Sequence, residues 1–192
     1  MRKLAALVIS TALFVAPAML SVADPAAVAA ENTKAPVTEQ VANNTASAAA
    51  PVPDLPKEVV EKMKLNEERF ARGYIADGLP DELKDLAQTC GYPLAIEIDW
   101  MSFVGDFDAL QNLQHQGVGR LTCAVKSICG DEVGKGRMAK KVKKLVVKNV
   151  SDIKEKKVVV GDGQIQLIGA FGKGSEGYYP DNEIQKIIED AL

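Results

Sequence analysis

The sequence is poor in residue types that mark many catalytic and nucleic-acid-binding sites. Aromatic residues make up 5% of the chain, and His115 is its single histidine. The absence of a Cys-x-x-Cys pair argues against a thiol oxidoreductase. The formal charge is −3, and no aromatic residues interleave with the basic ones, so we expect no nucleic-acid partner.

The first residues instead have the pattern of a secretory signal peptide. Arg2 and Lys3 precede an apolar run over residues 4–20, and the small-residue triplet Ser21-Val22-Ala23 follows. An uncleaved anchor is the alternative, but this run is short for a hydrocarbon core about 30 Å thick. The sequence has no second apolar run, and it has no cysteine near the cleavage region that could carry a lipid anchor. We therefore expect no stable membrane anchor.

Composition then divides the remaining chain in two. Residues 24–54 are rich in Ala, Pro and Thr, and this composition predicts a disordered linker. Residues 55–192 have the length of one domain with one core. The sequence thus predicts a signal peptide over 1–23, a linker over 24–54, and a single domain exported to the periplasm or the extracellular space.

Three cysteines allow one disulfide and leave one thiol. If residues 121–129 are helical, Cys123 and Cys129 face different directions and lie about 9 Å apart, too far for a disulfide. Cys129 lies beside the apolar face of this helix and Cys123 on the opposite side. We therefore predict a Cys90–Cys129 bond; three free thiols are the alternative.

Hydrophobic periodicity and turn residues predict an α+β fold, with about four strands in a small antiparallel sheet packed with four to six helices. Residues 145–150 suit both a helix and a strand, and we expect a strand. The expected helices cover 56–72, 80–90, 106–114, 120–129, 132–144 and a segment starting at Asp181, its N-cap candidate; Gly73 and Gly78 bracket a break. The expected strands cover 94–100, 145–150, 156–160 and 164–171.

An acidic group beside aromatic residues is one candidate site. Asp99, Asp106 and Asp108 lie near Trp100 in the sequence, and glycoside hydrolysis uses a pair of carboxylates beside a bound sugar. Strand alternation, however, places Glu97 and Asp99 on the face opposite Trp100. A solvated strand face followed by a helix-capping aspartate is therefore the favoured interpretation of this group.

The segment 135–157 is the second candidate site, with ten Lys or Arg against two acidic residues. Such a segment is expected to favour anionic polymers or lipid headgroups. The solvated face of a helix together with a protected sheet edge explains the same pattern. The candidate binding residues are Lys135, Arg137, Lys140, Lys141 and Lys144.

No motif identifies a reaction, a metal site or a cofactor. The sequence therefore favours an exported, soluble, non-catalytic domain that binds an envelope component or a partner protein. The alternatives are an envelope polysaccharide hydrolase that uses two of the three aspartates, and a module that binds anionic lipid or polymer through segment 135–157.

Overall fold

The computed structural model describes residues 54–192, so the expected signal peptide and nearly all of the expected linker lie outside it. The helices are α1 (Lys57–Val60), α2 (Leu65–Gly73), η1 (Tyr74–Gly78), α3 (Leu79–Cys90), η2 (Trp100–Phe103), α4 (Phe107–Asn112), η3 (Leu113–Val118), α5 (Gly119–Ile128), α6 (Glu132–Lys141), η4 (Ile153–Glu155), η5 (Phe171–Gly177) and α7 (Asp181–Ala191). The strands are β1 (Ala95–Ile98), β2 (Lys144–Asn149), β3 (Lys157–Gly161) and β4 (Gln164–Gly169).

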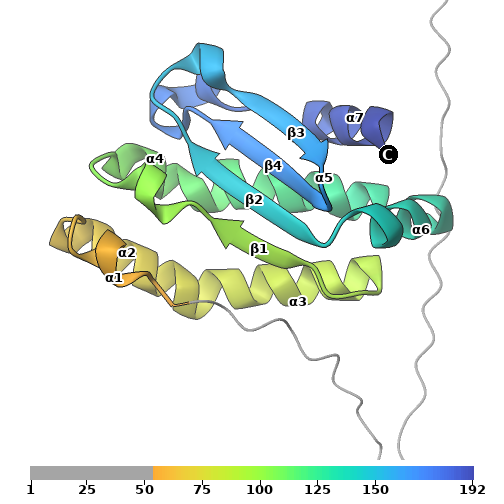
Figure 1. Cartoon of the computed structure of the whole chain (residues 1–192), viewed down its shortest axis with the longest axis horizontal. Coiled ribbons are helices and arrows are strands. Elements are labelled where there is room, and N and C mark those ends of the chain that lie inside the picture. The colour runs from red at the N-terminus through yellow and green to blue at the C-terminus, as the bar shows by residue number, and fades with distance from the viewer. Residues whose placement is uncertain (1–53) are drawn as a thin grey trace, which may run out of the picture. The chain divides into compact units, whose positions relative to one another are not determined.

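The four strands form one sheet in the order β1-β2-β4-β3, with α3, α5 and α7 covering one face (Figure 1). This arrangement confirms the α+β class and the expected number of strands. The expected antiparallel sheet is wrong, because β2 runs parallel to both β1 and β4 and only β3 and β4 are antiparallel. After β2 the chain passes to the sheet edge and forms β3 there. The hairpin then reverses its direction, so β4 lies between β2 and β3 and runs parallel to β2.

Alternation along the strands separates a buried face from an open one. Ile96, Leu145 and Leu167 point toward the helices and are at most 4% exposed. No helix of residues 54–192 lies over the opposite face (Figure 1). Val146 and Ile168, on that face, are still 93% buried. Their register partners on the neighbouring strands are polar: Glu97 and Gln166 beside Val146, and Lys148 and Lys157 beside Ile168.

Two long helices form most of the helical layer, and each contains a π-helical segment. Residues 65–90 form one helix through η1, and residues 107–128 form another through η3. The expected break between Gly73 and Gly78 is therefore wrong, since both glycines have right-handed helical angles. Packing of the apolar faces outweighs the cost of about 1 kcal/mol that glycine brings to a helix.

The other elements agree with the sequence predictions, with several exceptions. The expected helix over 56–72 is two helices, α1 and α2, separated by residues 61–64, and the expected strand over 94–100 ends at Ile98, before η2. Residues 144–149 form a strand, as expected, and the β3–β4 hairpin is confirmed. Asp162 and Gly163 both have positive φ in its two-residue turn, a geometry that suits Asp-Gly. Helix α6 ends at Lys141, three residues earlier than expected, and Pro180 rather than Asp181 occupies the N-cap of α7.

The predicted disulfide between Cys90 and Cys129 is present, with its two Cα atoms 5.0 Å apart. Cys90 is the last residue of α3, and Cys129 directly follows α5. The bond thus joins the C-terminal ends of the two long helices. Cys123 remains a free, exposed thiol.

Candidate functional site

The three candidate aspartates occupy different environments. Asp99 follows β1, and its carboxylate lies 3.5 Å from the Lys148 ammonium. Asp106 caps α4 by accepting a hydrogen bond from the Ala109 amide at 3.0 Å. Asp108, in the first turn of α4, is exposed. Asp99 and Asp106 are thus engaged in contacts that stabilise the fold.

Asp106 belongs to a polar network at the carboxyl ends of β1 and β2. The side-chain amide of Asn149, 94% buried, donates to the Asp106 carboxylate and to the Ser102 carbonyl. Its Oδ1 accepts from the Phe171 amide at 3.1 Å, and its backbone amide donates to the Ser102 hydroxyl at 2.9 Å. The network satisfies both polar atoms of the Asn149 side chain, as buried polar groups require.

The acidic strand face and the basic segment meet on the open face of the sheet. Lys144 on β2 contacts Glu97 on β1 at 2.7 Å, and the Lys148–Asp99 pair follows along the same two strands. These pairs are partly exposed, so each contributes at most about 1 kcal/mol. Their main effect is to neutralise charges that are separate in the sequence.

The remaining basic candidates lie on α6. Lys135 pairs with Glu132 at 3.4 Å, and Lys141 donates to the backbone carbonyl of Leu192. Lys140 is exposed, and Arg137 lines a cavity of about 290 Å³ between α6 and α7. The candidate cations are therefore divided between a helix and the open sheet face, and three of the five have a partner.

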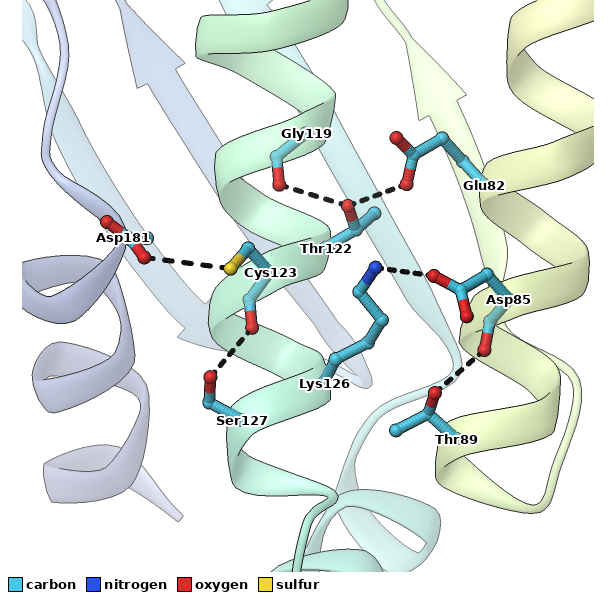
Figure 2. Close-up of polar contacts among 9 residues, drawn as sticks. All are labelled: Glu82, Asp85, Thr89, Gly119, Thr122, Cys123, Lys126, Ser127 and Asp181. Atoms are coloured by element: carbon cyan, nitrogen blue, oxygen red, sulfur yellow. Dashed lines mark hydrogen bonds and ion pairs between the residues drawn. The ribbon is translucent and has the colours of Figure 1, made fainter. Parts of the chain in front are cut away.

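Polar contacts also join α5 to the helices on both sides of it (Figure 2). On the α3 side, the Thr122 hydroxyl contacts Glu82 at 2.8 Å, and the Lys126 ammonium contacts Asp85 at 2.5 Å. On the α7 side, the Cys123 thiol faces a carboxylate oxygen of Asp181 at 3.6 Å. Helix α5 is thus held through charged and hydroxyl groups as well as through its apolar face.

A groove follows the α3 side of this layer, and we call it the helix groove. It comprises a cavity of about 480 Å³ beside η1 and one of about 300 Å³ beside α3. Both are lined by Gly78, Asp81 and Gln114, so the two adjoin. Gly78 belongs to η1 and Gln114 to η3, which places the π-helical segments of both long helices at the groove.

Tyr74 packs beneath this groove and has an unusual environment. It is 95% buried, it lines the larger cavity, and its hydroxyl forms no hydrogen bond within residues 54–192. A Cβ atom at Gly78 would lie 2.5 Å from the ring of Tyr74, so only glycine allows this packing. Burial first, and the negative charge of Glu82 second, raise the pKa of the hydroxyl.

Carboxylates form a row along one side of the groove. Asp77, Asp81 and Asp85 are spaced four residues apart in a continuous helix, which brings like charges close together. Within residues 54–192, Asp85 pairs with Lys126, whereas Asp77 and Asp81 form no ion pair. The same residues contain no cluster of three or more His, Cys, Asp or Glu arranged to bind a metal ion.

Sequence reasoning missed this site because it predicted an interruption of the helix between Gly73 and Gly78. Without the break, Asp77, Asp81 and Asp85 fall on one helical face, and that spacing was the available signal. The facing residue Gln114 comes from the other long helix, and no local pattern links it to Gly78. Only the packing of the two helices brings them together.

The chain shows no significant match to the models of known protein families, to characterised proteins or to solved structures.

Proposed function

We propose that this protein is an exported, non-catalytic binding domain of the cell envelope, and that the helix groove is its binding surface. The observation that carries this proposal is the pair of adjoining cavities between the two π-helical segments. Such segments interrupt regular helical hydrogen bonding and occur frequently at functional sites. Concave, largely preformed cavities are also the usual place for small ligands.

Two features support export. The pattern of the first 23 residues is that of a signal peptide. The Cys90–Cys129 disulfide suits an oxidising compartment, where such bonds form and persist. No helix of residues 54–192 has the length and apolar character needed to cross a membrane.

The other two functions have less support. Carboxylates that act as a glycosidase acid and base must face a bound sugar, whereas Asp99 and Asp106 are held by Lys148, a helix N-terminus and Asn149. An anionic-surface module needs a group of free cations on one face, whereas Lys144 and Lys148 are paired. Both functions remain predictions.

The binding surface is tested by filling it. Gly73 lines the larger cavity, has helical backbone angles, and has open space where a Cβ atom would be added. Gly73→Trp should therefore fold and occupy the groove, whereas Gly73→Ala should fold and leave it open. Amide correlation spectra of the protein, recorded with a library of amines, amino acids, sugars and dipeptides, report where each compound binds.

We expect at least one compound of this library to shift the amide signals of Gly78, Asp81 and Gln114 in the native protein and in Gly73→Ala. In Gly73→Trp these shifts should disappear. A library in which no compound shifts the groove signals would contradict the proposal, as would shifts that persist unchanged in Gly73→Trp.

A further inference from the structure

We propose that the outer edge of β3 pairs with β3 of a second copy of this chain, so that the two sheets join across a two-fold axis. Strand β3 lies at one end of the strand order and has a neighbour, β4, on one side only (Figure 1). An unpaired strand edge is a template for another strand. The edge shares no residue with the helix groove, so this inference is independent of the proposed binding surface.

The outer edge of β3 lacks most of the features that keep strand edges from pairing. Its register with β4 is uninterrupted over residues 157–161, so no bulge bends it away. Its sequence, Lys-Val-Val-Val-Gly, contains no proline and carries its single charge at the first position. Val159 is 42% exposed and is the one exposed large hydrophobic side chain of the sheet within residues 54–192.

The backbone groups of β3 that face outward belong to Val158 and Val160. The Gly169 carbonyl, at the end of β4, accepts a hydrogen bond from the amide of Val150, which directly follows β2. Because such groups alternate along a strand, odd-numbered residues of β4 face β2 and even-numbered ones face β3. The even-numbered residues of β4 are paired with the odd-numbered residues of β3. Val158 and Val160 therefore direct their amides and carbonyls outward, where they form no backbone hydrogen bond within residues 54–192.

One antiparallel register satisfies all four of these outward groups. In it, Val158 lies opposite Val160 of the partner subunit, and the two copies of Val159 meet at the axis. Each Val158–Val160 pair exchanges two hydrogen bonds, as in any antiparallel ladder. A shift by two residues in one direction uses Lys156, whose amide and carbonyl already bond to Ile153 and Tyr179. A shift in the other direction uses the turn residue Asp162.

The charges at the two ends of β3 agree with this register. Lys156 and Lys157 precede the valines, and Asp162 follows them in the turn. The antiparallel pair places Lys156 opposite Asp162 of the partner subunit. It places Lys157 opposite the partner's Gly161, which has no side chain to obstruct it. Opposite charges across two strands stabilise the pair, whereas a parallel arrangement would bring the lysines of the two copies together.

The paired surface is small, so we expect a weak dimer. Five residues of each copy form far less surface than the interface of a stable dimer. The dimer fraction should therefore rise between about 10 µM and about 1 mM, the range of weak association. Analytical ultracentrifugation of the exported, disulfide-bonded protein measures this equilibrium. A monomer at every concentration in this range would overturn the proposal.

Amide hydrogen exchange locates the contact. The amides of Val158 and Val160 should exchange rapidly in dilute protein and become protected as the dimer fraction rises. The Val159 amide faces β4 and should be protected throughout. Protection of Val158 and Val160 that does not depend on concentration would mean that another segment of the same chain covers the edge. Rapid exchange in the dimer would mean that another surface joins the copies, and either result overturns the proposal.

Substitution of Val159 tests the register. Val159→Lys places two positive charges against each other at the axis and removes a valine pair, so it should weaken dimerisation by about tenfold. It should leave the melting temperature of dilute protein nearly unchanged, because the side chain is exposed. Val133→Lys, at an exposed valine on α6, is the matched control and should leave dimerisation unchanged.

A charge-reversed mixture separates loss of this contact from a general effect of the substitution. Val159→Lys mixed with Val159→Glu should form a mixed dimer at least as tight as the native one, because the opposed charges then attract. Failure of the mixture to restore dimerisation, or equal weakening by Val133→Lys, would overturn the pairing of the two β3 strands.

Discussion

Asp106 illustrates, at the scale of single residues, how an apparent catalytic candidate can have a structural role. One carboxylate oxygen caps α4 and the other accepts from the buried Asn149 amide. The sequence suggested the capping role, because aspartate before a helix is a common N-cap. It could not suggest Asn149, which lies 43 residues further along the chain.

This role leads to a stability prediction. Asp106→Ala should lower the free energy of unfolding by about 1–2 kcal/mol, because the cap is lost and the Asn149 amide loses one acceptor. Asp108→Ala, at an exposed site in the same helix, should change it by less than about 0.5 kcal/mol. Urea denaturation monitored by circular dichroism measures both. Equal losses in the two variants would contradict the structural role of Asp106.

The free thiol of Cys123 gives a second prediction at this scale. Partial burial, its hydrogen bond to Asp181, and the negative charge of Asp181 raise the pKa of the Cys123 thiol. A raised pKa leaves less thiolate at neutral pH, so we expect iodoacetamide to react more slowly with Cys123 than with a free cysteine peptide.

Substitution at Asp181 tests the cause. Asp181→Asn should lower the pKa of the thiol and accelerate the reaction at neutral pH, whereas Asp190→Asn should not. The measurement is the rate of alkylation followed by mass spectrometry over a range of pH values. A rate that is unaffected by Asp181→Asn would contradict the assigned cause.

At the scale of elements, the angle between α5 and α6 depends on a close backbone approach. A Cβ atom at Gly134 would lie 1.9 Å from the Ile128 carbonyl oxygen, and backbone atoms cannot move aside as a flexible side chain can. Gly136, in the same helix, has open space at the corresponding position. The sequence shows two similar glycines, and only the tertiary contact distinguishes them.

The two glycines should therefore respond in opposite directions to alanine. Gly134→Ala should lower the free energy of unfolding by about 1–3 kcal/mol, because α6 must shift away from α5. Gly136→Ala should raise it by about 0.5–1 kcal/mol, the gain in helix propensity. Thermal denaturation of both variants measures the difference, and stabilisation by Gly134→Ala would contradict the close approach.

At the scale of the whole molecule, the disulfide and the open sheet face are the two features that distant parts of the chain create together. The bond closes a segment of 39 residues and fixes the ends of the two long helices that form the groove. On the open face, residues from β1 and β2 pair their charges in the folded domain. The net charge of a segment therefore does not give the charge of a surface.

Removal of the disulfide should affect the whole fold. Cys90→Ser with Cys129→Ser should lower the free energy of unfolding by about 4 kcal/mol, the chain entropy expected for a loop of this length. Cys123→Ser, which breaks no bond, is the control. Guanidinium denaturation measures stability, and a thiol assay on the denatured, unreduced protein should find one free thiol. Three free thiols would contradict the bond.

The sequence alone determined most of the local features: most helical and extended segments, the buried and open faces of β1, the β3–β4 hairpin and the pairing of Cys90 with Cys129. Residue spacing within a few turns or strands decides each of these. The tertiary structure decided the parallel pairs of β2, the unbroken helices through Gly78 and Gly119, the ion pairs on the open face and the helix groove. These depend on which distant segments become neighbours, because packing energy between helices outweighs the local preferences of single glycines.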